Sequence, residues 1–61
     1  MEKFGLYNYR LVFMAEVNKW GYQILKEDGH VLRESKDMFQ YEGIARFAAI
    51  GHISLLEQGK G

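Results

Sequence analysis

The chain has 61 residues, 48% of them hydrophobic and 15% aromatic, and its eight basic residues are balanced by eight acidic ones. This apolar content excludes an intrinsically disordered segment, and the length predicts a single small domain over 1–61. Because cysteine is absent and histidine occurs only twice, disulfides are excluded, a Cys/His zinc site is not expected, and the balanced charge gives little long-range attraction to nucleic acid or to anionic membranes.

A first strand is predicted over about 7–17, because "YNYRLVFMAEV" is rich in aromatic and β-branched residues. Asn18 opens a candidate turn of two residues, and "WGYQILK" then predicts a second strand over about 20–27. A turn of that length would place Phe13 opposite Ile24 in an antiparallel pair.

The pair Asp28 and Gly29 predicts a second hairpin turn, because it lies between two apolar-rich runs. A two-residue turn of this kind needs positive φ at both positions, which Asp and Gly tolerate. The third strand is predicted over about 30–35. In this register Leu25 would lie opposite Leu32.

A single helix is predicted over about 41–58, after the polar segment "RESKDMFQYEG". Ser35 and Asp37 are turn or capping candidates in that segment. Gly59 can cap the C-terminal end, with Lys60 near the negative end of the helix dipole. The chain is therefore expected to fold as an α+β domain, a three-stranded antiparallel meander packed by one C-terminal helix, in the order βββα.

Side chains alternate along each strand, so the registers above assign them to two faces of the sheet. The face expected to pack against the helix carries Tyr9, Leu11, Phe13, Ala15, Trp20, Tyr22, Ile24 and Val31. The opposite face carries Arg10, Val12, Met14, Gln23, Leu25 and Leu32. At about 100° per residue, the helix residues expected to face the sheet are Ala45, Ala48, Ala49, Ile53, Leu55 and Leu56.

More apolar surface is present than one helix on one sheet can bury. A domain of about 60 residues buries only roughly 60% of its unfolded surface, and self-association would supply the missing stability. We therefore predict a homodimer or partner interface, with ordinary scattered apolar exposure as the alternative. The candidate interface residues are Val12, Met14, Leu25, Leu32, Phe47 and Ile50.

Nucleic-acid binding by the exposed face of the three-stranded sheet is the second hypothesis, because a sheet can place side chains in a groove of DNA. The candidate contacts are Arg10, Lys19, Gln23, Arg33 and Lys36. Glu16, Glu27 and Glu34 are interleaved with these cations and oppose binding to phosphate.

No catalytic, cofactor-binding or metal-binding residue is predicted. His30 lies beside a hairpin turn with no cleft expected, and His52 falls among helix residues that should face the sheet, where a hydrogen bond would satisfy it. Neither a nucleophile elbow nor a phosphate-binding glycine motif is present. The expected function is a non-catalytic binding or adaptor domain.

A cytoplasmic location without membrane insertion is expected. The N-terminal stretch "MEKFGLYNYR" has an acidic residue and too short an apolar run for a signal peptide. No stretch of the sequence reaches the roughly 20 apolar residues that cross a bilayer.

Two family resemblances follow from these motifs. "YQILKEDGHVLRES", then Phe39, then the helix spacing of Ala45, Ala48, Ala49, Ile53 and Leu56, resembles the YegP-type family of small bacterial domains over Trp20 to Leu56. Those domains typically occur as paired repeats, so the resemblance implies that a single unit pairs with a second copy. "KWGYQI" and the Ala-bearing helix are similar to AP2-type and phage-integrase N-terminal DNA-binding domains, whose arginine-rich sheet is reduced here to Arg10 and Arg33.

Overall fold

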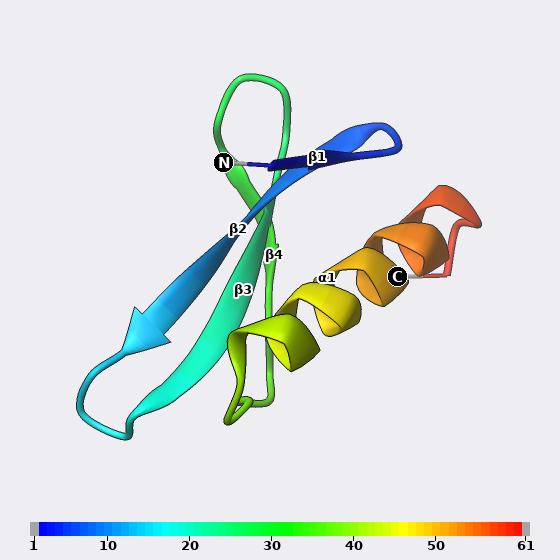
Figure 1. The fold of residues 1–61 in the computed structure, drawn as a ribbon. Coiled ribbons are helices and arrows are strands. Elements are labelled where there is room, and N and C mark those ends of the chain that lie inside the picture. Colours follow the sequence, from blue (N-terminus) through cyan, green and yellow to red (C-terminus); the bar gives the residue numbers. More distant parts are fainter. Residues whose placement is uncertain (1, 61) are drawn as a thin grey trace.

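The computed structural model describes residues 2–60 and shows a four-stranded antiparallel sheet with one α-helix on one face (Figure 1). The strands follow one another across the sheet in chain order, β1-β2-β3-β4. The elements are β1 (Glu2–Phe4), β2 (Tyr7–Met14), β3 (Lys19–Leu25), β4 (Val31–Glu34) and α1 (Glu42–Glu57). The α+β class and the C-terminal helix are confirmed, but the prediction of three strands is wrong because β1 adds a fourth.

The short strand β1 is held to the rest of the fold at both ends. Its turn into β2 passes through Gly5, whose φ of 59° lies in the left-handed region, where a side chain would be strained. The amide of Leu6 donates a hydrogen bond of 2.9 Å to Oε2 of Glu57, at the end of α1. Glu2 forms an ion pair with Arg46 in the middle of the same helix. Three residues with one turn carry too little pattern to predict a strand.

The first hairpin has a longer loop than predicted. β2 ends at Met14, and a four-residue turn over 15–18 closes with Asn18 at φ 55°. Phe13 consequently pairs with Trp20, and Ile24 pairs with Tyr9 instead of Phe13. The predicted register is wrong by four residues. Because four is an even number, the assignment of side chains to the two faces is unchanged.

The second hairpin lies where Asp28-Gly29 predicts it, but its loop has three residues, not two. The amide of Lys26 donates to the carbonyl of His30 at 2.9 Å, and the amide of Gly29 donates to the carbonyl of Lys26 at 2.9 Å. Only Gly29 has positive φ in this turn, at 92°, so the geometry is that of a β-turn followed by a left-handed glycine.

A register shift in β4 follows this turn. Leu25 pairs with Val31 instead of Leu32, and the ladder then returns to the predicted pairing of Ile24 with Arg33. Leu32 is the extra residue of this bulge. The longer loop and the bulge therefore compensate each other, and the far end of the predicted hairpin register is confirmed.

The segment between β4 and α1 continues along β3. The Ser35 amide donates to the Tyr22 carbonyl at 2.9 Å, and the Tyr22 amide donates to Ser35 Oγ at 3.1 Å. Further on, Trp20 and Phe39 exchange two backbone hydrogen bonds of 2.6 and 2.7 Å. Ser35 therefore acts as a side-chain extension of the sheet, and it holds the linker against β3.

Helix α1 begins after Tyr41, which makes no side-chain capping hydrogen bond. At its other end Gly59 has a φ of 78°, and its amide donates to the carbonyl of Leu56 at 3.0 Å. The Lys60 amide donates to the Leu55 carbonyl at 2.8 Å, which completes a Schellman cap. The prediction of Gly59 as the C-terminal cap is confirmed. Within the described residues no helix is long and apolar enough to cross a membrane.

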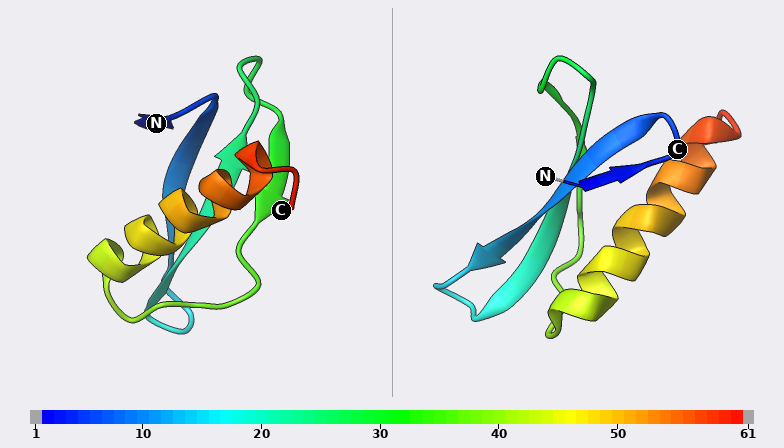
Figure 2. Two further views of the ribbon diagram at one scale, coloured as in Figure 1. Left: turned by 90° about the vertical axis from the view of Figure 1, so that its right-hand side faces the viewer. Right: turned by 45° about the horizontal axis from the view of Figure 1, so that its top comes forward.

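The core lies between α1 and the strands β2 and β3. The left view of Figure 2 shows the helix lying across the sheet. Its buried members are Tyr9, Tyr22, Ile24, Ala49 and Ile53. Figure 1 shows that the β2–β3 hairpin extends beyond the helix. For this reason Phe13 and Ala15, which are predicted to be core residues, are exposed. Val31, also predicted to be a core residue, is exposed at the start of β4, beside the second hairpin loop.

Candidate functional site

One face of α1 points away from the sheet and is apolar. Ile44, Phe47 and Leu55 expose 52%, 78% and 46% of their surface. The prediction that Leu55 faces the sheet is wrong, and Ile50, predicted to lie in the partner interface, instead packs against the core. The helix is rotated about its axis relative to the predicted orientation, because apolar side chains lie on most sides of it and their spacing does not select one.

Two glycines flank Phe47 on this face. Gly43, Phe47 and Gly51 are spaced four residues apart, so they form a row along the helix. A Cβ atom added to Gly43 or Gly51 would meet no atom within 4 Å, so the space above both is open. We name this surface the outer helix face, defined by Gly43, Ile44, Phe47, Gly51 and Leu55. Of these five residues, only Phe47 is among the interface residues predicted from the sequence.

The outer face of the sheet is less available than predicted. Leu25 exposes only 1% of its surface, so the prediction that it contributes an exposed interface side chain is wrong. Val12 and Leu32 are half-buried, and Met14 is exposed. Gly21 is also buried, and a Cβ atom added to it would lie 2.9 Å from Ser35 Oγ. The predicted stripe across three strands is therefore not a continuous apolar surface.

Met14 instead borders a hollow at the tip of the first hairpin. This hollow has a volume of about 390 Å³, and Phe13, Val17 and Met38 also line it. The rings of Phe13 and Trp20 lie beside it, 5.1 Å apart between centroids. The hollow is apolar and shallow, and it offers no charged partner other than Glu16.

The predicted nucleic-acid contacts do not share one surface. On the outer sheet face Arg10 Nε donates to Gln23 Oε1 at 2.6 Å, and Gln23 Nε2 donates to Glu34 Oε1 at 3.1 Å. This row of side-chain hydrogen bonds therefore ends at the carboxylate of Glu34. Arg33 and Lys36 line a groove beside α1 instead. This division weakens the case for a continuous phosphate-binding surface.

That groove lies between α1 and the β4 strand with its following loop, and we name it the α1–β4 groove. Its volume is about 660 Å³, in the range of ligand-binding clefts. Aromatic and small side chains form its floor, namely Tyr22, Phe39 and Ala48. His52 and Leu55 of α1 form one wall.

A hydrogen bond crosses the floor of the groove. The Tyr22 hydroxyl lies 2.9 Å from His52 Nδ1, and the two rings meet edge to face with centroids 5.8 Å apart. The Phe39 ring stacks on Tyr22 at 6.4 Å. Burial, and secondarily the charge of Asp37, raises the pKa of the Tyr22 phenol. The prediction that His52 is partly buried and hydrogen-bonded is confirmed.

The rim of the groove carries both signs of charge. Arg33, Lys36 and Lys60 supply cations, and Glu34 and Asp37 supply carboxylates. Within residues 2–60, neither Lys36 nor Lys60 forms an ion pair. Apart from Arg33 and Lys36, none of these groove residues is predicted from the sequence to bind a partner, because no sequence pattern indicates that the linker after β4 borders the helix.

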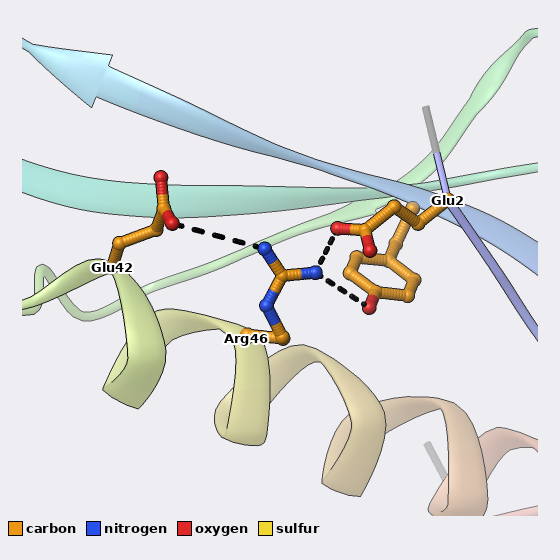
Figure 3. A network of polar contacts seen from close by, with 4 residues as sticks. Glu2, Glu42 and Arg46 are labelled. Atoms are coloured by element: carbon orange, nitrogen blue, oxygen red, sulfur yellow. Dashed lines mark hydrogen bonds and ion pairs between the residues drawn. The ribbon is translucent and has the colours of Figure 1, made fainter.

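A polar network on the opposite flank of α1 has a structural role (Figure 3). Arg46 bonds to Glu2, donates to the Tyr9 hydroxyl at 3.3 Å, and lies 3.8 Å from Glu42. The hydrogen bond to Glu2 is the main cause of a raised pKa of the Arg46 guanidinium. The network joins β1, β2 and α1, so its charged groups are engaged within the fold.

The second hairpin holds the remaining histidine. Asp28 accepts hydrogen bonds from the amide of His30 at 3.0 Å and lies 2.9 Å from its Nδ1. These bonds lower the pKa of the Asp28 carboxyl. Both side chains are exposed, which agrees with a turn and not a cleft. Across the part of the chain that the structure describes, no cluster of His, Cys, Asp and Glu could hold a metal ion.

No family model, no curated protein and no solved structure matches this chain. The resemblances to the YegP-type family and to AP2-type domains therefore stay predictions. The function proposed below is therefore inferred from two surfaces of the chain itself, the outer helix face and the α1–β4 groove.

Proposed function

We propose that this chain is a small non-catalytic binding domain that self-associates as a homodimer through the outer helix face. The observation that carries the proposal is the exposure of Phe47, at 78%, one helical turn from the open space above Gly51. A large side chain and a gap on one face of one helix make that face complementary to itself. Such a surface suits a two-fold symmetric contact between identical chains.

The positions of these residues favour an antiparallel pairing of two helices. Helix α1 has 16 residues, so it is about 24 Å long, and its midpoint lies beside Ala49. Phe47 and Gly51 lie at equal distances on either side of Ala49. A two-fold axis through this midpoint would place Phe47 over Gly51 of the second copy and would overlap the helices along their full length.

The same axis pairs the other large side chain with the other glycine. Leu55 and Gly43 also lie at equal distances from Ala49. Each copy would therefore place two exposed side chains over two glycines. Burying a Phe or Leu side chain contributes about 1.5–3 kcal/mol, which adds to the stability of a domain with a small core.

A charge at the centre of this contact tests the proposal. Phe47→Glu should shift the chain to monomer in sedimentation equilibrium, because two carboxylates would meet an apolar contact. Val17→Glu, at another exposed apolar position, on the first hairpin, is the control and should dimerise as the unaltered chain does. Circular dichroism would verify that both variants fold. An unchanged association constant for folded Phe47→Glu would contradict the proposal.

The nucleic-acid hypothesis has less support from the geometry. Its candidate cations are divided between the outer sheet face and the α1–β4 groove, and the formal net charge is zero. Phosphate binding would weaken steeply as salt increases. A salt titration of binding to duplex and single-stranded DNA distinguishes it from an apolar protein contact.

A further inference from the structure

The strand β4 lies at an edge of the sheet and borders the α1–β4 groove. An edge strand leaves every second amide and carbonyl without a partner strand. Ser35 bonds to Tyr22 on β3, so alternation along the chain directs the backbone groups of Glu34 to the free edge. The Leu32 carbonyl accepts a hydrogen bond of 2.9 Å from the Arg33 guanidinium. The edge next to the groove can therefore accept another strand at Glu34.

The helix is positioned to cover such a strand. Its core contacts are with β2 and β3, and its residues His52 and Leu55 line the groove together with Arg33 and Glu34 of β4. Both views of Figure 2 show the helix on one face of the sheet, with β4 along one side of it. An edge strand beside a helix is the arrangement that peptide-binding domains use for strand addition.

The chemistry of the groove indicates the kind of segment that would fit. Its floor of Tyr22 and Phe39 is apolar and aromatic, so it would receive an apolar side chain. Lys36 and Lys60 form no ion pair within residues 2–60, so they are open to an acidic side chain. We propose that the α1–β4 groove binds an extended acidic peptide, which adds to β4 as a further strand.

The alternation of side chains along a strand sets the sequence pattern of the bound peptide. Successive side chains of a strand point to opposite sides, so every second side chain of the peptide would point to the aromatic floor. The residues between them would point away from the groove. Lys36 and Lys60 lie on the rim of the groove, so they would attract carboxylates that flank the apolar side chains. Backbone hydrogen bonds to β4 supply affinity, and the floor supplies selectivity.

Panning a random linear peptide library on the immobilised chain identifies the probe. We expect enriched sequences with apolar residues two positions apart and acidic residues flanking this apolar pair. The doubly reversed variant Lys36→Glu/Lys60→Glu should bind the selected peptide at least about tenfold more weakly. Lys3→Glu/Lys19→Glu makes the same charge change away from the groove and should bind normally. Failure to enrich any sequence, or equal losses in both variants, would overturn the proposal.

Methylation of the peptide backbone tests strand addition itself. N-methyl groups placed one at a time along the selected peptide should weaken binding about tenfold at alternate residues and little at the residues between them, because only alternate amides face β4. A loss without this period would contradict strand addition. Binding of a small carboxylate or of inorganic phosphate as tight as that of the peptide would assign the groove to a small anion instead.

This inference does not depend on the proposed homodimer. Gly51 and Leu55 belong to both surfaces, but Phe47 lies outside the groove. Phe47→Glu should therefore bind the selected peptide normally even as a monomer. Loss of self-association and loss of peptide binding are thus separate results, and each tests one proposal.

Discussion

The hydroxyl of Tyr22, on the inner strand β3, lies 2.9 Å from Nδ1 of His52 on α1. This hydrogen bond joins the sheet to the helix at the floor of the α1–β4 groove. The phenol must stay neutral to keep its burial favourable, and burial raises its pKa above the ordinary value of 10.0.

Tyr22→Phe should lower the free energy of unfolding by about 1 kcal/mol near neutral pH, because the bond to His52 is lost while the ring is kept. In the unaltered chain the raised pKa makes a contribution that is complete below pH 10.0 and is lost as pH rises through the folded-state value. The variant should lack this alkaline loss. Urea titrations across alkaline pH measure both effects, with Tyr41→Phe, an exposed tyrosine, as the control.

Gly51→Leu should change folding and association in opposite directions. A Cβ at this position meets no atom within 4 Å, and replacing a helical glycine by leucine adds about 0.8 kcal/mol to helix stability. The same side chain fills the gap that Phe47 of the second copy would occupy. Measured in the Phe47→Glu background, thermal stability should rise. In the unaltered background the dimer should weaken, and an equally tight dimer would argue against the assigned contact.

Gly5→Ala should destabilise the chain by about 1 kcal/mol or more. The φ of 59° at Gly5 is strained for any residue with a Cβ, and the added carbon would collide with the Glu57 carboxylate. The collision would displace the Glu57 carboxylate and so weaken the hydrogen bond that it accepts from the Leu6 amide. Hydrogen exchange at Leu6 would report it. Gly43→Ala, where the added carbon has open space, should show no such loss.

Asp28 should make the free energy of unfolding depend on pH in the acidic range. The His30 amide and ring lower its pKa, so its contribution to stability is complete above the ordinary carboxyl range and is lost as pH falls through the lowered folded-state value. Asp28→Ala should therefore differ from the unaltered chain at neutral pH and converge with it in strong acid. A constant difference across the whole pH range would show that the carboxylate charge is not the cause.

The second hairpin shows how much of the fold the sequence predicts. Gly29 marks the turn correctly, because the left-handed φ of 92° suits glycine. The loop length was missed because the Asp28 carboxylate accepts the His30 amide, which holds Asp28 at negative φ and lengthens the loop by one residue. Local side-chain hydrogen bonds of this kind compete with the ideal two-residue turn.

The first hairpin shows why the two faces could be predicted when the register could not. The signal at Asn18 was correct, since this residue has positive φ. Nothing in "MAEVN" indicated that Ala15 to Val17 would join the turn. The resulting shift of four residues preserved alternation, so Tyr22 and Ile24 still face the helix.

The candidate surfaces were harder to predict than the fold. Apolar side chains occur on most sides of α1, so helical spacing alone did not decide between Ile50 and Leu55 for the exposed position. In the fold, Ile50 packs against the core cluster and Leu55 is the exposed residue. The groove depends on the path of the linker along β3, which arises from the bonds of Ser35 and Phe39 and has no signature in the sequence.

The most direct test of the central claim is the molar mass of the unaltered chain in solution, measured by light scattering over a wide range of protein concentration. Self-association through the outer helix face should give a mass approaching twice 7.1 kDa as concentration rises, and Phe47→Glu should remain at the mass of one chain under the same conditions. A mass of 7.1 kDa for the unaltered chain at every concentration would contradict the account.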